Sequence, residues 1–110
     1  MEFLIIARDG TDPEAPERRR RARPAHLANA ERLQRAGHLL IGGALLDDAG
    51  AMIGSAAVAR FDTREQLDEW LRTDPYVVEG VWRDIQVLPY RVAPHYHHLV
   101  ERPDDDGAAP

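Results

Sequence analysis

Phe-Leu-Ile-Ile-Ala, residues 3–7, is the stretch on which the fold depends. It is apolar throughout, without the alternation of a half-exposed strand, which is typical of a strand covered on both faces. We therefore expect it in the middle of a sheet. Asp9-Gly10 ends the strand, and residues 11–16 follow as a polar loop that contains prolines.

A long helix is predicted next, over residues 17–36. It starts near Pro16 or Glu17, and Gly37 supplies its stop. Pro24 falls inside this range, so we expect the helix to bend there.

The helix has an apolar side that is expected to be buried, with Leu27, Ala30 and Leu33 at three-residue steps. Polar side chains are expected on the opposite side, namely Asn29, Glu31, Arg32 and Arg35. His26 shares its side of the helix with positions 30, 33 and 37. This side chain should face inward or lie along the edge of the packed face.

Two strands are predicted at residues 38–46 and 51–61, joined by the hairpin turn Asp47-Asp48-Ala49-Gly50. Gly42-Gly43 and Gly54-Ser55 interrupt these strands. Such glycines mark either a bulge or a place where something approaches the backbone closely, and both interpretations stay open.

A second helix begins at Asp62-Thr63, where Thr63 with Gln66, or Asp62 with Glu65, has the spacing of a capping box. Its expected buried stripe consists of Leu67, Trp70 and Leu71.

A short helical turn follows, capped by Asp74 with Pro75 in its first position and ended by Gly80. Residues 82–90 form the last predicted strand, with Ile85 and Val87 on one face.

The predicted order is strand, helix, strand, strand, helix, strand. This is the α+β class, with the ferredoxin-like βαββαβ arrangement of an antiparallel sheet and both helices on one face. The doubly apolar first strand then implies that the other face is buried against a second copy. We expect a homodimer.

Composition sets further bounds. A chain of 110 residues with 44% hydrophobic residues fits one globular domain, assigned to residues 1–94. No apolar run reaches the roughly 20 residues of a membrane span, and Met1-Glu2 does not open a signal peptide, so we expect a cytoplasmic protein. The net charge of -5 argues against nucleic acid as a partner. Without cysteine, thiol chemistry and disulfides are excluded.

Residues 95–110 form a histidine-containing, acidic tail that we expect to be disordered from about residue 101. Histidines 95, 97 and 98 could hold a transition metal, but such clusters near a terminus are usually adventitious. We therefore expect no metal site.

The chain lacks the common catalytic motifs, including G-x-S-x-G, the P-loop, the dinucleotide fingerprint and H-E-x-x-H. What remains is a histidine with carboxylates, which could transfer protons. Taken singly, each candidate has an ordinary structural interpretation. His26 would be a helix residue, Asp74 an N-cap, Ser55 a strand hydroxyl, Arg23 a solvated charge and Tyr76 a core aromatic.

From Phe3 to about Tyr90 the sequence resembles the YCII-related (YciI-like) domain family. The matching pieces are Asp9 at the end of the first strand, Arg23, His26 and Leu27, Gly54-Ser55, Trp70, Asp74-Pro75-Tyr76, Gly80-Val81 and Pro89. Family members are similar in fold to muconolactone isomerase, a dimeric α+β barrel. One branch includes a dehydrochlorinase that acts on a hydroxylated aromatic ring. The chain departs from the family at Gly42-Gly43, where Gly-Pro is frequent, and in its histidine-rich tail.

The resemblance implies that His26 and Asp74 form a catalytic pair in one pocket. His26 would transfer a proton on a small, cyclic or aromatic molecule while Asp74 orients its ring. Ser55 and Tyr76 would hold polar substrate groups, Arg23 would bind a carboxylate or phenolate, and Asp9 is counted among the substrate-contacting residues. No cofactor is required.

Two alternatives stay open. The chain could be a non-catalytic dimeric module that binds a small ligand or a partner. The arginine run of residues 18–23 could bind an acidic partner, although such a run on a helix is usually a solvated face.

Overall fold

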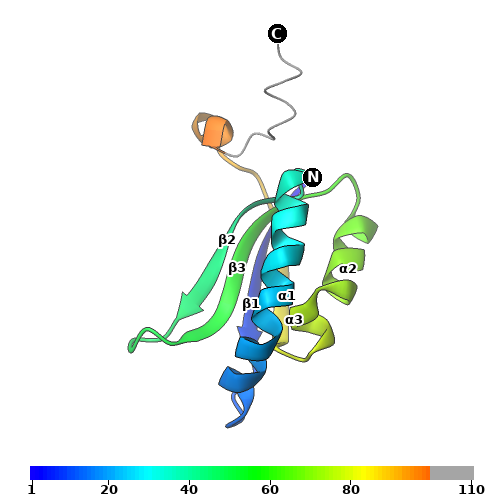
Figure 1. Ribbon diagram of the computed structural model, residues 1–110. Coiled ribbons are helices and arrows are strands. Elements are labelled where there is room, and N and C mark those ends of the chain that lie inside the picture. The colour runs from blue at the N-terminus through cyan, green and yellow to red at the C-terminus, as the bar shows by residue number, and fades with distance from the viewer. Residues whose placement is uncertain (100–110) are drawn as a thin grey trace.

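The computed structural model of the protein describes residues 1–99. Its elements are β1 Glu2–Asp9, α1 Ala15–Arg35, β2 Leu39–Leu46, β3 Met52–Arg60, α2 Arg64–Thr73, α3 Pro75–Val78, β4 Trp82–Tyr90 and the 3₁₀ helix η1 Pro94–Leu99. The strands form one antiparallel sheet in the order β2-β3-β1-β4, and α1, α2 and α3 lie on one of its faces (Figure 1). The predicted α+β class with a ferredoxin-like arrangement is confirmed.

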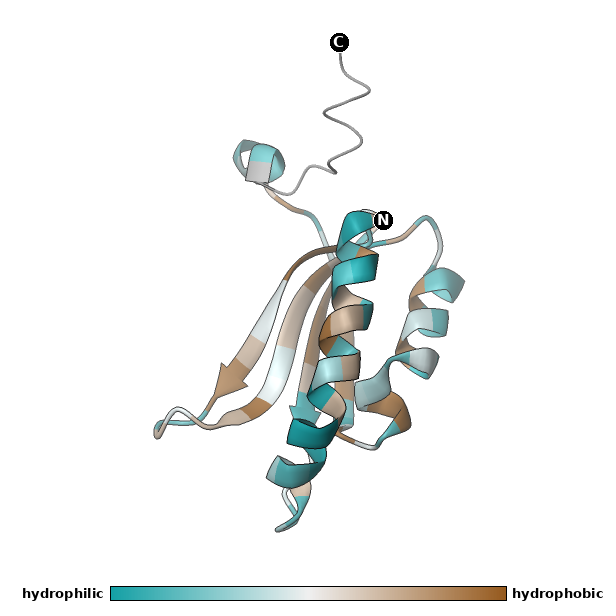
Figure 2. Ribbon diagram, viewed as in Figure 1, coloured by the Kyte–Doolittle hydropathy of each residue, from teal (hydrophilic) through white to brown (hydrophobic). Residues whose placement is uncertain are grey.

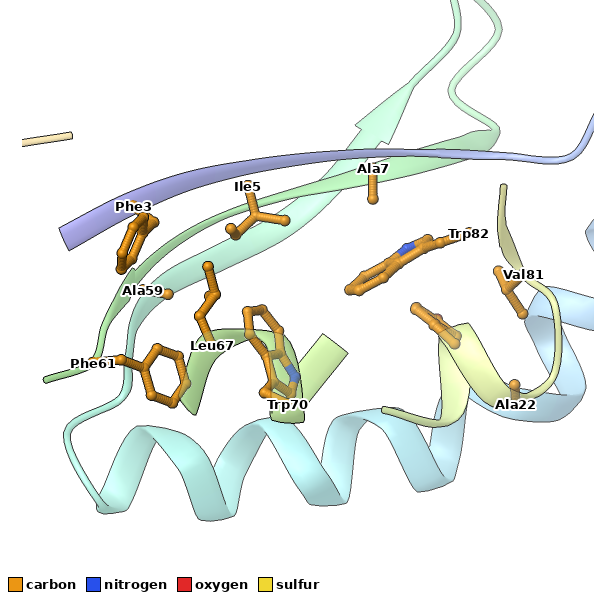
Figure 3. Close-up of a cluster of buried hydrophobic side chains, with 11 residues drawn as sticks. Phe3, Ile5, Ala7, Ala22, Ala59, Phe61, Leu67, Trp70, Val81 and Trp82 are labelled. Carbon is orange, nitrogen blue, oxygen red and sulfur yellow. The ribbon is translucent and has the colours of Figure 1, made fainter. Parts of the chain in front are cut away.

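Strand β1 lies between β3 and β4, as its apolar run predicts. Phe3, Ile5 and Ala7 point toward the helices and are almost completely buried (Figure 3). Leu4 and Ile6 point to the other face and are only half-buried in the single chain. That face is therefore apolar without a cover among the described residues.

Helix α1 begins at Ala15, one or two residues before the predicted start. Pro24 lies inside it, and the helix continues through this position to Arg35. Much of its surface is hydrophilic, as Figure 2 shows. The helix therefore contacts the rest of the molecule along a narrow face only.

The prediction of which α1 residues face inward was partly wrong. Leu27 is 46% exposed, whereas Arg19 is 6% exposed. Asn29, expected on the solvent side, reaches a buried carboxylate instead. The buried face runs through Ala22 and His26, because this side of the helix meets polar groups of α3 and of the sheet. The arginine run is consequently not a uniformly solvated face.

The hairpin of β2 and β3 forms as predicted, with Gly50 in the left-handed region at φ +88. It extends away from the helices (Figure 1). Gly54 marks a close approach, because a Cβ there would lie 2.4 Å from the carbonyl oxygen of Ala7. Gly43 has open space around it instead. The pairing register of β2 and β3 runs unbroken through Gly42 and Gly43, so the close approach is shown at Gly54 and no bulge is present at the glycine pair.

Helix α2 has the predicted capping box, formed by Thr63 with Gln66 and not by Asp62 with Glu65. Its first buried residue, Leu67, has no exposed surface. The helix passes directly into α3, and Asp74 serves as the C-cap of the first and the N-cap of the second. This double role fixes the Asp74 side chain at the junction.

Beyond the sheet, the described chain ends in a short 3₁₀ helix at the start of the predicted tail. Residues 94–99 form η1, and Val92 before it donates its backbone N–H to Glu2 at 2.7 Å. The disorder expected from residue 101 falls outside the described residues. None of the helices among residues 1–99 has the length and apolar character needed to cross a membrane.

Candidate functional site

The side chains of His26 and Asp74 are in direct contact. Nδ1 of the His26 ring lies 2.8 Å from Oδ1 of Asp74. The two residues are 48 positions apart in the sequence and are brought together by the packing of α1 against α3. The Asp74 side chain has no exposed surface and that of His26 is 13% exposed. One end of the pair is therefore sealed and the other is open.

Asp74 accepts hydrogen bonds from four donors. Its Oδ1 accepts from His26 and from the backbone N–H of Tyr76 at 2.9 Å. Its Oδ2 accepts from the indole N–H of Trp70 at 3.0 Å and from the amide of Asn29 at 3.3 Å. Burial raises the pKa of this carboxyl, but the bond and charge of His26 and the bonds from Tyr76 and Trp70 outweigh it and lower the pKa. Asp74 is therefore an ionised, fully bonded acceptor at neutral pH.

The charge of Asp74 fixes the tautomer of the histidine ring. A carboxylate can only accept hydrogen bonds, so Nδ1 of His26 has to carry a hydrogen. In the neutral ring this leaves Nε2 with a lone pair. Among residues 1–99, no protein group is hydrogen-bonded to this nitrogen. The arrangement leaves a proton acceptor available for a ligand.

Aromatic rings hold the imidazole of His26 in place. The ring of Tyr76 stacks on it with a centroid distance of 3.8 Å and an interplanar angle of 10°. Trp82 meets it edge-on, with centroids 5.4 Å apart. Stacking and the Asp74 bond together restrain both the plane and the rotation of the imidazole.

A cavity of about 540 Å³ opens beside this pair, between α1 and the β2–β3 hairpin. Its volume lies within the range of small-molecule sites. Its wall includes Arg19, Arg23 and His26 of α1, Gly42, Gly43 and Ala44 of β2, Ser55, Ala56 and Ala57 of β3, and the rings of Trp70, Tyr76 and Trp82. The strand side of the cavity therefore combines small residues of β2 and β3 with longer apolar ones, namely Ile5, Leu39, Leu40, Ile41 and Met52. Helix α1 contributes the arginines and the imidazole.

A second polar network, centred on Arg19, connects α1 to β1 and β3. Nη1 of Arg19 bonds both carboxylate oxygens of Asp9 at 2.9 Å, and its Nη2 donates to the Ser55 hydroxyl at 3.1 Å. The Ser55 oxygen also accepts from the indole N–H of Trp82 at 3.1 Å. The Arg19 guanidinium lies over the Tyr76 ring, 4.8 Å from its centroid. Arg19 thus links the sheet to the aromatic ring that holds His26.

Four of the six predicted site residues line the cavity: Arg23, His26, Ser55 and Tyr76. The fifth, Asp74, lies behind the wall and is bonded to His26. The sixth, Asp9, is not part of this wall, because its carboxylate is engaged by Arg19. Tyr76 is 1% exposed, so its ring is part of the packing as well as of the wall.

Sequence reasoning missed Arg19, Asn29 and Trp70 as members of the site. Their spacing carried a signal, because Arg19 precedes His26 by two helical turns and Asn29 follows it by three residues. Trp70 stands four residues before Asp74, one turn away on the same helix face. Because Arg19 and Asn29 are polar, they were expected at the surface despite this spacing.

No three histidine or acidic side chains of residues 1–99 converge in the way metal ligands do. The histidines of η1 are exposed and separate from the cavity.

Fold and cavity together define a small ferredoxin-like α+β domain with a cavity beside a His–Asp pair. The chain belongs to the YCII-related domain family, whose sequence model matches residues 1–91. Protein YciI of Escherichia coli O6:H1 is 36% identical over 97 residues, covering 83% of this chain and 97% of that protein. An uncharacterized protein of Haemophilus influenzae is 33% identical with the same coverage. The resemblance drawn from the motifs is confirmed.

Solved structures give the same fold. 5-Chloro-2-hydroxyhydroquinone dehydrochlorinase (TftG) from Burkholderia phenoliruptrix AC1100, in complex with 2,5-dihydroxybenzoquinone, matches with a TM-score of 0.72 and 26% identity. The match covers 86% of this chain and 98% of that one. Rv0793 from Mycobacterium tuberculosis, at a TM-score of 0.50 and 22% identity over 86% of this chain and 99% of its own, shows the fold alone.

Proposed function

We propose that this protein is a cofactor-independent enzyme of the lyase or isomerase type that moves a proton on a small cyclic or aromatic molecule. The family and its dehydrochlorinase neighbour fit an enzyme-like function on a small molecule. The observation that carries the proposal is the bond between Nδ1 of His26 and the buried carboxylate of Asp74 at the cavity wall.

In the proposed reaction, Nε2 of His26 takes a proton from the substrate. The ring becomes an imidazolium, and the adjacent Asp74 carboxylate stabilises this positive charge. The imidazolium then returns the proton at another atom of the substrate or to a leaving group. Isomerisation and elimination therefore share the first step and differ only in where the proton goes.

The shape of the cavity favours a flat substrate. Gly42, Gly43 and the alanines of β2 and β3 leave room for a ring against the sheet, and apolar residues such as Leu39 and Met52 line the same cavity. Arg23 lies at the same wall and would pair with a carboxylate or phenolate of the substrate. The hydroxyls of Ser55 and Tyr76 would contact its other polar groups.

We also propose that a second copy covers the free face of the sheet. Leu4 pairs with Val58 and Leu88 on that face, which makes it apolar across β1, β3 and β4. Leu88 is 41% exposed in the single chain, and Ile41 on β2 is 66% exposed. An apolar sheet face of this kind is usually covered by another element or by another molecule.

The proposal is tested by ligand binding followed by turnover. Thermal shift with 2,5-dihydroxybenzoquinone and related hydroxylated rings is measured on the wild type and on His26→Ala. Hits are then assayed for turnover, with chloride release from 5-chloro-2-hydroxyhydroquinone as one readout. We expect turnover in the wild type and a loss of at least about 100-fold in His26→Ala.

His38→Ala is the matched control. His38 is also partly buried and stacked on an aromatic ring, that of Phe61 at 4.5 Å, but it does not line the cavity. Ligands that bind equally well to the wild type and to His26→Ala would remove His26 from the site. Tight binding without any turnover would instead identify a non-catalytic binding module.

A further inference from the structure

Two buried polar atoms at the cavity wall have no hydrogen-bond partner, the Nε of Arg19 and the hydroxyl of Tyr76. Both residues are more than nine-tenths buried, at 6% and 1% exposure. Buried polar atoms in folded proteins are nearly always paired, and each exception calls for an explanation. A buried donor without an acceptor has lost its hydrogen bonds to water and gained none in the protein, which lowers the stability of the fold.

The imbalance at this wall is entirely on the donor side. Arg19 has only donors, and its other two nitrogens are used by Asp9 and Ser55. Burial raises the pKa of Tyr76, outweighing the opposite effect of the Arg19 and Arg23 charges, so its hydroxyl stays protonated at neutral pH. The Ser55 oxygen already accepts from Arg19 and Trp82. Its own hydrogen is therefore a further donor without an acceptor among the described residues.

The available acceptors are already occupied. Asp74 is fully bonded by its four donors, and both oxygens of Asp9 face Arg19. The charges of Arg19 and Asp9 offset each other, so what the inner wall offers is surplus hydrogen-bond donors without a free acceptor. The chemical group that completes such a wall is an oxygen that carries negative charge and only accepts hydrogen bonds.

We propose that Arg19 and Tyr76 form a subsite for one anionic oxygen of the ligand, a phenolate or an enolate. This inference rests on the proposed function, because it names the class of substrate that His26 would act on. The Arg19 guanidinium lies over the Tyr76 ring, 4.8 Å from its centroid, so both donors belong to one stacked pair of side chains. Solvent does not reach either atom in the unliganded chain. A ligand oxygen therefore reaches them only when a side chain at the wall moves.

The subsite also suits the reaction. When Nε2 of His26 removes a proton from a hydroxylated or keto ring, the C–H or O–H electron pair stays on the ring and places negative charge on its oxygen. Hydrogen-bond donors already in position stabilise this anionic oxygen more than they stabilise the oxygen of the neutral starting compound. The subsite would therefore favour the ionised form of the ligand over the neutral form.

The test uses 4-nitrophenol, whose phenolate is yellow and whose neutral form is nearly colourless, and 4-nitroanisole as a neutral analogue of similar shape. Binding of both is measured at several pH values, with the phenolate absorbance as the readout. We expect bound 4-nitrophenol to ionise at a lower pH than the free compound, by on the order of one pH unit for a tenfold preference. The anisole should bind weakly.

Tyr76→Phe removes only the hydroxyl, and Tyr90→Phe removes one that lies outside the cavity and serves as the control. We expect Tyr76→Phe to lose about tenfold or more in phenolate affinity. Its stability without ligand should be unchanged or higher, because an unpaired buried group is removed. A double variant, Arg19→Gln with Asp9→Asn, removes the guanidinium without leaving Asp9 buried and unpaired, and it should abolish the preference for phenolate.

Equal affinity for phenolate and phenol, failure of 4-nitrophenol to bind, or unchanged phenolate affinity in Tyr76→Phe would each overturn the subsite. Because these are equilibrium measurements without turnover, their outcome is independent of the enzymatic test. Phenolate selectivity with no catalysis by His26 would support the subsite and refute the proposed function. Catalysis without phenolate selectivity would support the proposed function and refute the subsite.

Discussion

Replacing Asp74 by asparagine tests the centre of the site with almost no change in shape. The substitution exchanges one carboxylate oxygen for an NH₂ group. Oδ1 faces the His26 ring and the backbone N–H of Tyr76, while Oδ2 faces Trp70 and Asn29. At either position, the new NH₂ group, itself a donor, replaces an oxygen that accepts two hydrogen bonds. It therefore faces two donors and no acceptor.

Only some of these donors can adapt. His26 can move its hydrogen from Nδ1 to Nε2, and Asn29 can turn its amide around. The indole N–H of Trp70 and the backbone N–H of Tyr76 cannot change, so one of them is left unpaired in a buried place. An unpaired buried donor costs about 1–3 kcal/mol, and loss of the charge weakens the remaining bonds. We expect Asp74→Asn to lower the free energy of unfolding by about 2–5 kcal/mol.

The pH dependence has a defined sign. The pKa of Asp74 is lowered in the folded protein, so its contribution to stability is fully present above its unfolded pKa of about 4 and is lost as the pH falls through the folded value. The stability difference between the wild type and Asp74→Asn should therefore depend on pH in the acid range. It should shrink as the pH is lowered below about 4.

Urea unfolding measured by tryptophan fluorescence gives both results. The midpoint should fall by roughly 1–3 M urea at neutral pH. The control is Asp68→Asn, which removes an exposed partner of Arg64 on the same helix and should change stability by less than about 0.5 kcal/mol. If Asp74→Asn behaved like this control, or if the difference did not depend on pH, the account of Asp74 as a buried ionised acceptor would be wrong.

Three further changes probe the cavity, the sheet and its free face. Gly42→Val should keep or raise stability, because a Cβ there makes only ordinary contacts, with the Cβ of Ala57 at 3.5 Å and the carbonyl oxygen of Ala56 at 3.6 Å. It should nevertheless abolish the thermal shift with 2,5-dihydroxybenzoquinone by filling the cavity, and an unchanged shift would show that the ligand binds elsewhere. Gly54→Ala should cost more than about 2 kcal/mol in urea unfolding because of its contact with the Ala7 carbonyl, and a cost below 0.5 would contradict that geometry. Wild type should scatter light as a dimer at micromolar concentration and Leu88→Arg as a monomer; a monomeric wild type would refute the dimer.

The sequence was sufficient for most of the fold because local signals agreed with one another. The apolar run of β1, the turn at Gly50 and the capping box of Thr63 each act within a few residues. Such features depend on backbone geometry and nearby hydrogen bonds, and the long-range packing did not override them. The order of elements then left few topologies to consider.

The buried face of α1 could not be predicted in the same way. Hydrophobic periodicity assigns Leu27 to the core and Asn29 to solvent, yet Leu27 is 46% exposed and Asn29 bonds Asp74. Periodicity assumes that the partner surface is apolar. Here it is a carboxylate and a set of donors contributed by distant parts of the chain. Only the tertiary structure brings those groups together, so hydrophobic periodicity alone could not place the polar residues of this face.

The site contains two opposite departures from ordinary pairing. Asp74 has more donors than a carboxylate needs to stay ionised, while Arg19 and Tyr76 have donors without acceptors. The first arrangement stabilises the fold and fixes the His26 tautomer. The second costs stability in the free protein and can be repaid only by a group that is absent from the chain. A purely structural pocket would have no reason to keep that cost, so the unpaired donors favour a ligand that brings an anionic oxygen to His26.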